Sequence, residues 1–235
     1  MKLRLTTFFA LFISMSLMAQ IPQAEQKALE ELYHQTNGAQ WNQTWDLSLD
    51  ASDLPGVTVE NGHVTEIRML FNNLSGTIPA TIGHLKELKV LELSFNKLQG
   101  ALPTTLGDLT KLEVLALNGN NLKGNIPTTI SKLSKLRQLH VSSNQLNGEI
   151  PADFVRLSQL EVFNVFDNNL KGALPVGLAK NRNIREFMVA ENNFENTNEI
   201  SNILLSNSGQ VNLQNNIFNP SGKSIIAIES SDDEN

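Results

Sequence analysis

The chain has 235 residues, a formal net charge of −6 at pH 7 and no cysteine. The lack of cysteine excludes disulfides, thiol nucleophiles and cysteine metal sites. The negative charge disfavours partners that are themselves negatively charged, so we expect no nucleic acid and no anionic lipid surface among the ligands.

The first 19 residues have the pattern of a secretory signal peptide. Lys2 and Arg4 precede an apolar stretch over residues 8–18, which ends at the small residue Ala19. This stretch is shorter than the about 20 residues that span a bilayer, and no second such stretch follows, so we expect no membrane span. We expect a bacterial type of signal, cleaved between Ala19 and Gln20. The mature protein would then be periplasmic, at the cell surface or secreted.

Residues 20–61 are expected to form an N-terminal cap for the repeats that follow. The pattern of residues 24–35 predicts a helix with one apolar stripe, and two tryptophans lie downstream of it. The apolar residues available to cover the first repeat are Ala28, Leu29, Leu32, Trp41, Trp45 and Val57.

From residue 62 onward, one pattern recurs every 24 residues. A fixed period of this size predicts a solenoid, in which copies of one supersecondary unit stack on each other. The period is marked by Asn72, Asn96, Asn120, Asn144, Asn168, Asn192 and Asn216. We expect about six to seven repeats over residues 62–220, followed by an acidic tail over 221–235. The last two repeats are degenerate, because Asn196 and Glu199 replace the usual glycine and proline.

Each repeat begins with L-x-x-L-x-L, an alternation that predicts a short strand with one buried face. The side chains expected to point inward are Leu91, Leu93, Leu115, Leu117, Leu139, Val141, Phe163 and Val165. Parallel pairing of these strands gives a sheet about 30 Å long. The asparagine after each strand is expected to bond backbone groups that the turn leaves unpaired.

The full text, L-x-x-L-x-L-x-x-N-x-L-x-G-x-I/L-P, resembles the plant-type subclass of leucine-rich repeat proteins. Five copies carry its glycine, at Gly76, Gly100, Gly124, Gly148 and Gly172. The resemblance implies an α/β solenoid, a right-handed superhelix with a parallel β-sheet on its concave face and a helical N-terminal cap. It also implies that the concave face binds a protein or peptide. Caps of plant members carry paired cysteines, which this chain lacks.

The candidate ligand-binding residues are outward positions of the predicted sheet, where the framework imposes no residue type. The middle of this face combines uncharged polar side chains with one aromatic ring, a composition typical of protein-binding centres, although a solvated sheet face tolerates the same residues. The candidates are Asn118, His140, Ser142, Asn164, Phe166 and Met188. Phe71 and Phe95 either extend this patch or pack on the turn.

No residue pattern predicts catalysis, a cofactor or a metal site. The histidines, His34, His63, His84 and His140, lie in different repeats or in the cap, without the spacing of metal ligands. Neither a G-x-S-x-G sequence nor a glycine-rich phosphate-binding loop is present.

We therefore expect a secreted, non-enzymatic module that recognises a protein or peptide on its concave face. The alternative is glycan binding at an envelope or host surface, although the tyrosine and tryptophans favoured for sugar stacking all lie in the cap. A third interpretation is ice or crystal-surface binding by a column of threonines, Thr81, Thr105 and Thr129.

Overall fold

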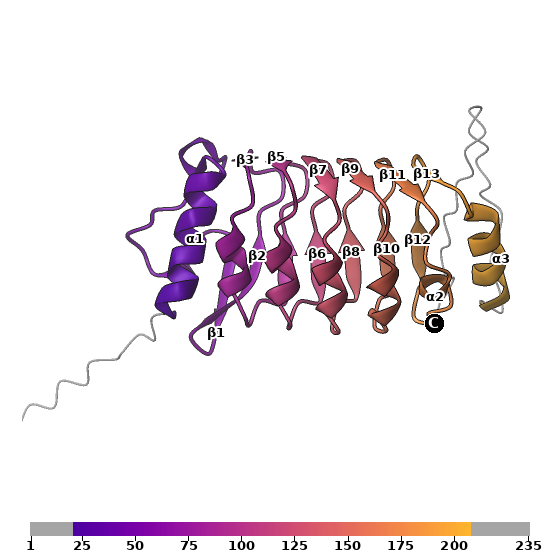
Figure 1. Ribbon diagram of the computed structural model, residues 1–235. Helices are drawn as coiled ribbons and strands as arrows, with labels where there is room; N and C mark the ends of the chain where they lie inside the picture. Colours follow the sequence, from indigo (N-terminus) through magenta and orange to yellow (C-terminus); the bar gives the residue numbers. More distant parts are fainter. Residues whose placement is uncertain (1–20, 208–235) are drawn as a thin grey trace, which may run out of the picture.

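The computed structural model of the protein describes residues 21–207, which form one row of stacked units between two terminal helices (Figure 1). The predicted signal peptide, Asn216 with the end of the repeat region, and the acidic tail lie outside these residues. The first terminal helix, α1 (Gln23–Gln35), is the one predicted for the cap.

Seven strands form a sheet along the whole row, in the order β1-β2-β4-β6-β8-β10-β12. The last six are parallel, and equivalent residues of successive repeats pair, as Leu91 does with Leu115 and Leu115 with Leu139. The strands are β1 (Val57–Glu60), β2 (His63–Arg68), β4 (Val90–Glu92), β6 (Val114–Ala116), β8 (Gln138–His140), β10 (Val162–Asn164) and β12 (Glu186–Met188). The predicted parallel sheet is confirmed, and its outward side is called the concave face below.

The first strand of this sheet belongs to the cap and runs antiparallel to the second. Asn61 and Gly62 join the two strands, both at positive φ (53° and 76°). Asn-Gly is the preferred pair for such a two-residue hairpin, because both positions need positive φ. The hairpin places β1 beside the first strand of the repeats, so β1, rather than a repeat strand, forms this edge of the sheet.

The inward side chains form one continuous core from the cap to the last described helix. All eight residues predicted to point inward are fully buried. Alternation along a strand places one face of the sheet in the core, so the neighbouring positions point out. The pattern of period two therefore determined correctly which side chains are free to meet a ligand.

A second sheet, which the sequence pattern did not predict, lies after the asparagine of each repeat. Its six short strands are parallel. They are β3 (Ser75–Gly76), β5 (Lys97–Gly100), β7 (Asn121–Asn125), β9 (Gln145–Gly148), β11 (Asn169–Gly172) and β13 (Asn193–Phe194). The repeated glycine at the end of each of the middle strands has positive φ, as at Gly100 (79°). Glycine takes this conformation without a steric penalty, so the chain can bend there toward the opposite side of the repeat.

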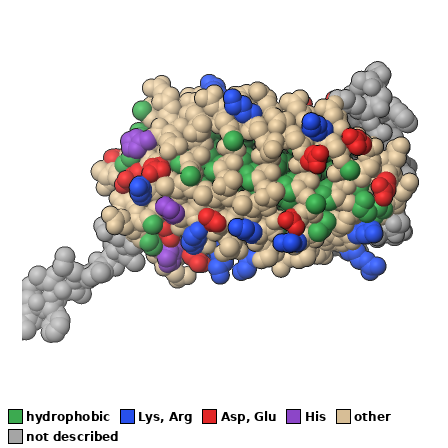
Figure 2. Space-filling view, in the orientation of Figure 1, with side chains coloured by type: hydrophobic (Ala, Val, Ile, Leu, Met, Phe, Trp, Pro, Cys, Tyr) green, Lys and Arg blue, Asp and Glu red, His purple; other side chains and the backbone are tan. Residues whose placement is uncertain are grey.

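Short 3-10 helices complete the repeats and lie in front of the seven-stranded sheet in Figure 1. Each follows the repeated proline, whose fixed φ suits a helix start and whose missing N–H is not needed there. The helices of the repeats are η3 (Ala80–His84), η4 (Thr104–Asp108), η5 (Thr128–Lys132), η6 (Ala152–Arg156) and the short α2 (Val176–Ala179), while η1 (Gly38–Gln40) and η2 (Ala51–Asp53) lie in the cap. Figure 2 shows apolar side chains in a band along this side of the molecule, with charged side chains above and below it.

The repeated asparagines form a ladder of hydrogen bonds between repeats, as predicted. The Asn96 amide oxygen accepts from the backbone N–H of Asn72 (2.9 Å) and Leu74 (3.1 Å), and its nitrogen donates to the carbonyl of Met69 (2.7 Å). Corresponding bonds recur in the next four repeats. Among the described residues, no buried side-chain nitrogen or oxygen lacks a hydrogen-bond partner. This column is therefore structural.

The cap continues the ladder in place of a preceding repeat. The Asn72 amide accepts from the backbone N–H of Gln43 (2.6 Å) and donates to its carbonyl (3.1 Å). The carbonyl of Thr36 accepts from the Ser75 N–H (3.0 Å) and from the indole N–H of Trp41 (2.9 Å). Backbone groups at the end of the stack are thereby satisfied without a disulfide.

The other end of the described chain is closed by a longer helix, α3 (Thr197–Asn207). It follows β13, at the position where earlier repeats have glycine, proline and a 3-10 helix. The Asn196 amide exchanges hydrogen bonds with the backbone N–H (2.8 Å) and carbonyl (3.0 Å) of Leu174. The departure from the repeat sequence therefore coincides with a change of structure.

Candidate functional site

The six predicted ligand-binding residues lie on four adjacent strands of the concave face or just beyond them. His140 pairs with Asn164, and Asn164 with Met188, which places these three in one line across the strands. We call this line the central row; its full membership is Arg68, Glu92, Ala116, His140, Asn164 and Met188. The adjacent line, two residues further along each strand, is the neighbouring row of Leu70, Ser94, Asn118, Ser142, Phe166 and Ala190.

Hydrogen bonds within the protein orient the polar side chains of these rows. The Asn118 amide oxygen accepts from both the backbone N–H (2.9 Å) and the hydroxyl (3.0 Å) of Ser142. The Asn164 amide oxygen accepts from the backbone N–H of Phe166 (3.2 Å). The amide nitrogens of both asparagines remain without a partner among residues 21–207, so each is available to donate a hydrogen bond to a ligand carbonyl.

His140 lies in the middle of the central row and is partly buried. Its Nε2 lies 3.3 Å from the amide oxygen of Gln138. Burial lowers the pKa of His140 below the ordinary histidine value, and the smaller opposing effect comes from Glu92. The ring is therefore neutral near pH 7 and offers one donor and one acceptor rather than a charge.

The cap end of the concave face carries a group of three charged side chains. The half-exposed Arg68 guanidinium donates to the carboxylates of Glu66 and Glu92, at 2.9 Å in each case. The hydrogen bond to Glu66 is the main cause that raises the pKa of Arg68. One cation is thus shared by two anions, whereas the centre of the face is uncharged.

A third line of outward side chains, which we call the rim row, follows the neighbouring row directly. It consists of Phe71, Phe95, Gly119, Ser143, Asp167 and Glu191, all with φ between 50° and 62°. The backbone N–H of each of the first five donates to a carbonyl in the next repeat, as from Phe95 to Asn118 (2.7 Å). These bonds fix every member of the rim row at the same place in its repeat.

Two phenylalanines occupy the cap end of the rim row. Their rings stack in parallel, with centroids 4.6 Å apart and planes inclined by 4°. Phe71 is 64% exposed and Phe95 48% exposed, and Leu70 beside them is also exposed. The sequence left open whether these rings pack on the turn, and the structure places them at the surface.

Phenylalanine is an unfavourable residue for the left-handed backbone conformation that Phe71 and Phe95 adopt. Left-handed backbone costs a non-glycine residue roughly 1–2 kcal/mol, and Phe lacks the short polar side chain with which Asn or Asp lowers this cost. Stacking of two rings stabilises the fold by about 0.5–1.5 kcal/mol, which is no more than this backbone cost. Rings this exposed add little stability through burial. Glycine, serine, aspartate and glutamate serve at the same place in later repeats. The stack itself therefore has no need of the two rings.

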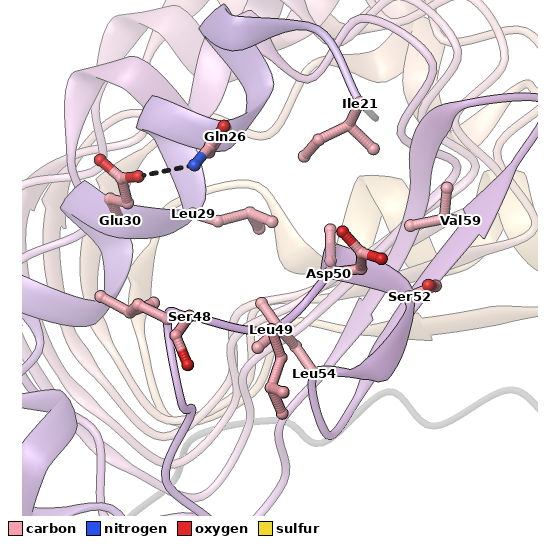
Figure 3. Close-up of a pocket in the computed structure, with 12 residues that line it drawn as sticks. Ile21, Gln26, Leu29, Glu30, Ser48, Leu49, Asp50, Ser52, Leu54 and Val59 are labelled. Atoms are coloured by element: carbon pink, nitrogen blue, oxygen red, sulfur yellow. Dashed lines mark hydrogen bonds between the residues drawn. The ribbon is translucent and has the colours of Figure 1, made fainter. Parts of the chain in front are cut away.

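A pocket of about 210 Å³ lies in the cap, between α1 and the segment that follows it. Figure 3 shows Glu30 and Asp50 on opposite sides of this pocket and Leu29 among its apolar lining residues. Gln26 donates to the Glu30 carboxylate (3.1 Å). The pocket is small and is lined by residues of the cap, and no sequence signal predicted it.

Two other groups of residues considered in the sequence are used within the protein. His63 Nδ1 lies 2.7 Å from the buried carboxylate of Glu25, whose other oxygen accepts from the Val64 N–H (2.8 Å). The hydrogen bond to Glu25 raises the pKa of His63. In the threonine column, the hydroxyls of Thr105 and Thr129 donate to backbone carbonyls of the preceding repeat (2.7 and 2.6 Å).

Several kinds of site have no residues to support them in the described part of the chain. Residues 21–207 contain no group of three or more histidine or acidic side chains that could hold a metal ion. Within the same range, no helix is long and apolar enough to cross a membrane. The tryptophans Trp41 and Trp45, which sugar stacking would favour, are buried in the cap.

A 24-residue unit with a parallel sheet, an asparagine ladder and a hairpin-and-helix cap defines a leucine-rich repeat solenoid. A sequence profile of the leucine rich repeat family matches residues 62–122 and 112–170. The leucine-rich repeat ectodomain of the receptor kinase SOBIR1 from Arabidopsis thaliana is 31% identical, with a TM-score of 0.63. That match covers 74% of this chain and 94% of the SOBIR1 structure. The chain belongs to the leucine-rich repeat family, in its plant-type subclass.

Two other similar structures are much longer than this chain. The PEPR1–AtPEP1 structure is 28% identical over 74% of the chain but only 25% of its own length, with a TM-score of 0.66. The plant peptide hormone receptor RGFR1 in complex with RGF2 is 32% identical over 55% of the chain and 20% of its own length, with a TM-score of 0.54. A search of curated protein sequences finds no match.

Proposed function

We propose that this protein is a secreted, non-catalytic module that holds a protein or peptide against its concave face. The observation that carries the proposal is the uncharged centre of that face. There, two amide donors, the neutral His140 ring, Phe166 and Met188 lie on adjacent strands or just beyond them, and no helix within residues 21–207 packs over these strands. Such a mixture of donors and apolar surface suits an extended peptide backbone and its side chains.

The similar structures favour a peptide or protein over other ligands. RGFR1, a plant peptide hormone receptor, was solved in complex with RGF2, and PEPR1 with AtPEP1. Because this chain spans only a quarter of PEPR1 and a fifth of RGFR1, the activities of those whole receptors are not carried over. The proposal concerns only recognition by the shared repeat.

Export places the ligand outside the cytoplasm. The N-terminal pattern predicts cleavage between Ala19 and Gln20 and a bacterial type of secretion signal. We propose that the mature protein acts in the periplasm, at the cell surface or in the medium, and therefore meets peptides or proteins of the envelope or surroundings. N-terminal sequencing of the exported protein tests this, and a start other than Gln20 contradicts the proposed site.

The binding proposal is tested by affinity capture with the protein beginning at Gln20 as bait, using envelope and culture fractions of the producing cells. The test variant carries Asn164→Asp and Phe166→Glu, which place two negative charges in the two rows. The control carries Asn147→Asp and Gln99→Glu, which add the same charge at exposed positions of the second sheet. All three proteins are first compared by circular dichroism and thermal unfolding.

A ligand retained by the parent and the control, but lost by the concave variant, is the expected result. A bound ligand would have to cover the two new carboxylates and would lose its contact with the Phe166 ring. Both effects disfavour the bound state, so we expect a loss of at least about tenfold in affinity. Equal capture by a folded concave variant contradicts the location of the site. A ligand identified as a polysaccharide contradicts the proposal in favour of glycan binding.

A further inference from the structure

The rim row changes character along the solenoid in a way that matches one kind of ligand. Its cap end carries the exposed ring pair of Phe71 and Phe95, its middle the small residues Gly119 and Ser143, and its far end Asp167 and Glu191. The Asp167 carboxylate makes no ion pair within the part of the chain that the structure describes, and its residue is exposed.

We infer that the rim row is a recognition strip for an extended peptide segment that carries an apolar side chain and, about six residues away, a basic one. This inference rests on the proposed function, since it assumes a peptide or protein ligand. It goes beyond that proposal by assigning a separate line of residues and the sequence pattern that this line selects.

The ring geometry favours an apolar side chain over a sugar at the cap end. Phe95 lies between Phe71 and Gly119, where an added Cβ would lie only 2.7 Å from ring atom Cδ1. The stacked arrangement covers one face of each ring, and Gly119 approaches one side of the Phe95 ring. The exposed Leu70 lies beside Phe71. Such a surface suits an aliphatic or aromatic side chain, which packs against ring edges as well as faces.

The distance between the two ends of the strip sets the spacing in the ligand. Phe71 and Asp167 are separated by four repeats, or about 19 Å at about 4.8 Å per strand. An extended chain covers this distance in about six residues, at about 3.1–3.4 Å each. Residues six apart point to the same side both in a β-strand, with its period of two, and in a polyproline helix, with its period of three.

Charge complementarity determines which group lies at the far end. Asp167 and Glu191 are adjacent members of the row, so a lysine or arginine of the ligand would meet a negative surface there. The small residues between the two ends leave the path of the ligand backbone open. A ligand in the opposite orientation would place its basic side chain on two phenyl rings and lose the pairing with the carboxylates.

The test is a selection of random dodecapeptides displayed on phage against the immobilised protein beginning at Gln20, followed by fluorescence anisotropy with the synthetic consensus peptide. Three variants are compared with the parent and with Phe166→Glu, a variant in the neighbouring row. One carries Phe71→Asn and Phe95→Asn, because asparagine tolerates positive φ; one carries Asp167→Ser, the residue type of the preceding repeat. The third, Val155→Ser, is a matched control, since Val155 and Phe95 are both 48% exposed.

We expect selected peptides to share an apolar residue and a lysine or arginine six positions apart. The double phenylalanine variant should weaken binding by at least about tenfold, and Asp167→Ser by about fivefold. The second effect should vanish in about 1 M NaCl, where the screening length is about 3 Å. The Val155→Ser control should bind like the parent, and the double variant should melt no lower than the parent because it relieves backbone strain.

Three results overturn the inference, and each leaves the proposed function to its own test. In the first, the selected peptides no longer bind Phe166→Glu but bind both rim variants with full affinity. This result supports the concave site and refutes the rim strip. Failure to enrich any peptide also refutes the rim strip, whereas the proposed function is decided separately by the affinity capture. A double variant that loses thermal stability while binding is unchanged shows that the ring pair is structural.

Discussion

Replacing Asn120 by alanine removes one rung from the middle of the asparagine ladder. This side chain is 7% exposed, and its oxygen accepts from the Leu98 N–H (3.0 Å). Its nitrogen lies within hydrogen-bond distance of the carbonyls of Leu93, Leu117 and Asn118, at 3.0–3.2 Å. Alanine makes none of these bonds. The Leu93 and Leu117 carbonyls each keep a second amide donor, from Asn96 (2.9 Å) and Asn144 (3.0 Å), whereas the Leu98 N–H loses the amide oxygen that it donates to.

The expected loss of stability is about 3 kcal/mol. The buried Leu98 N–H is left without its acceptor, which costs about 1–3 kcal/mol. The Leu93 carbonyl loses one of its two amide donors and keeps Asn96, a net loss of about 0.5–1.5 kcal/mol. A domain of this kind is stable by roughly 5–15 kcal/mol in total. The substitution therefore removes a substantial part of that stability without changing the apolar core.

Urea unfolding measures this loss with two independent probes. Both tryptophans, Trp41 and Trp45, lie in the cap, so their fluorescence reports the cap, whereas circular dichroism reports the whole stack. With a urea dependence of about 2 kcal/mol per M, a loss of 3 kcal/mol lowers the midpoint by about 1.5 M. Coincident transitions would show that cap and repeats unfold together, which the free-energy calculation requires.

The neighbouring residue supplies a matched control. Asn121 has the same side chain on the same turn, but it is exposed. Asn121→Ala should change stability by no more than about 0.5 kcal/mol. Equal midpoint shifts for the two variants would refute the assignment of the stabilisation to the buried ladder.

Two further predictions concern packing and pH. At Gly107, an added Cβ would lie 2.3 Å from the Thr129 carbonyl oxygen, so Gly107→Ala should cost about 1–3 kcal/mol in urea unfolding, and an unchanged midpoint contradicts this. Because Glu25 raises the pKa of His63, stability from that pair is complete below the unfolded pKa of about 6.5 and is lost as the pH rises through the folded value. Burial lowers the pKa of His140, so its effect is opposite, and stability falls as the pH drops below about 6.5. Melting temperatures are measured between about pH 5 and 8. As the pH falls, the melting temperature should decrease more steeply in His63→Gln than in the parent, and less steeply in His140→Gln. Curves parallel to that of the parent would contradict both assignments.

The sequence predicted those parts of the fold that one repeat encodes by itself. The alternation of Leu91 and Leu93 with outward residues required a strand with one buried face, and the 24-residue period placed each asparagine beside the next. Both predictions are confirmed. The ligand-binding role of the rows stays a prediction, because outward positions carry no structural constraint from which a ligand can be deduced.

Features that depend on contact between distant segments were missed. The second sheet pairs backbone groups of polar segments, such as Gln99 with Asn121, whose side chains show no apolar alternation. The bond between Glu25 and His63 spans 38 residues and depends on how the cap helix docks. The ring pair is visible in the sequence, since Phe71 and Phe95 occupy the same position in two successive repeats. Its left-handed backbone was not foreseeable, because Phe disfavours that conformation.

The arrangement of bonds in this stack separates stability from recognition. The repeats are joined through backbone groups and buried asparagines, and none of these bonds uses an outward side chain of the rim row. The six members of that row keep φ within 50–62° although they range from phenylalanine to glycine and glutamate. Their side chains can therefore differ while the backbone that presents them stays the same, except that an added Cβ at Gly119 would lie 2.7 Å from the Phe95 ring. Loss of a ladder rung such as Asn120 should lower stability and leave ligand preference intact, whereas replacement of Phe71 and Phe95 should alter preference and leave stability intact.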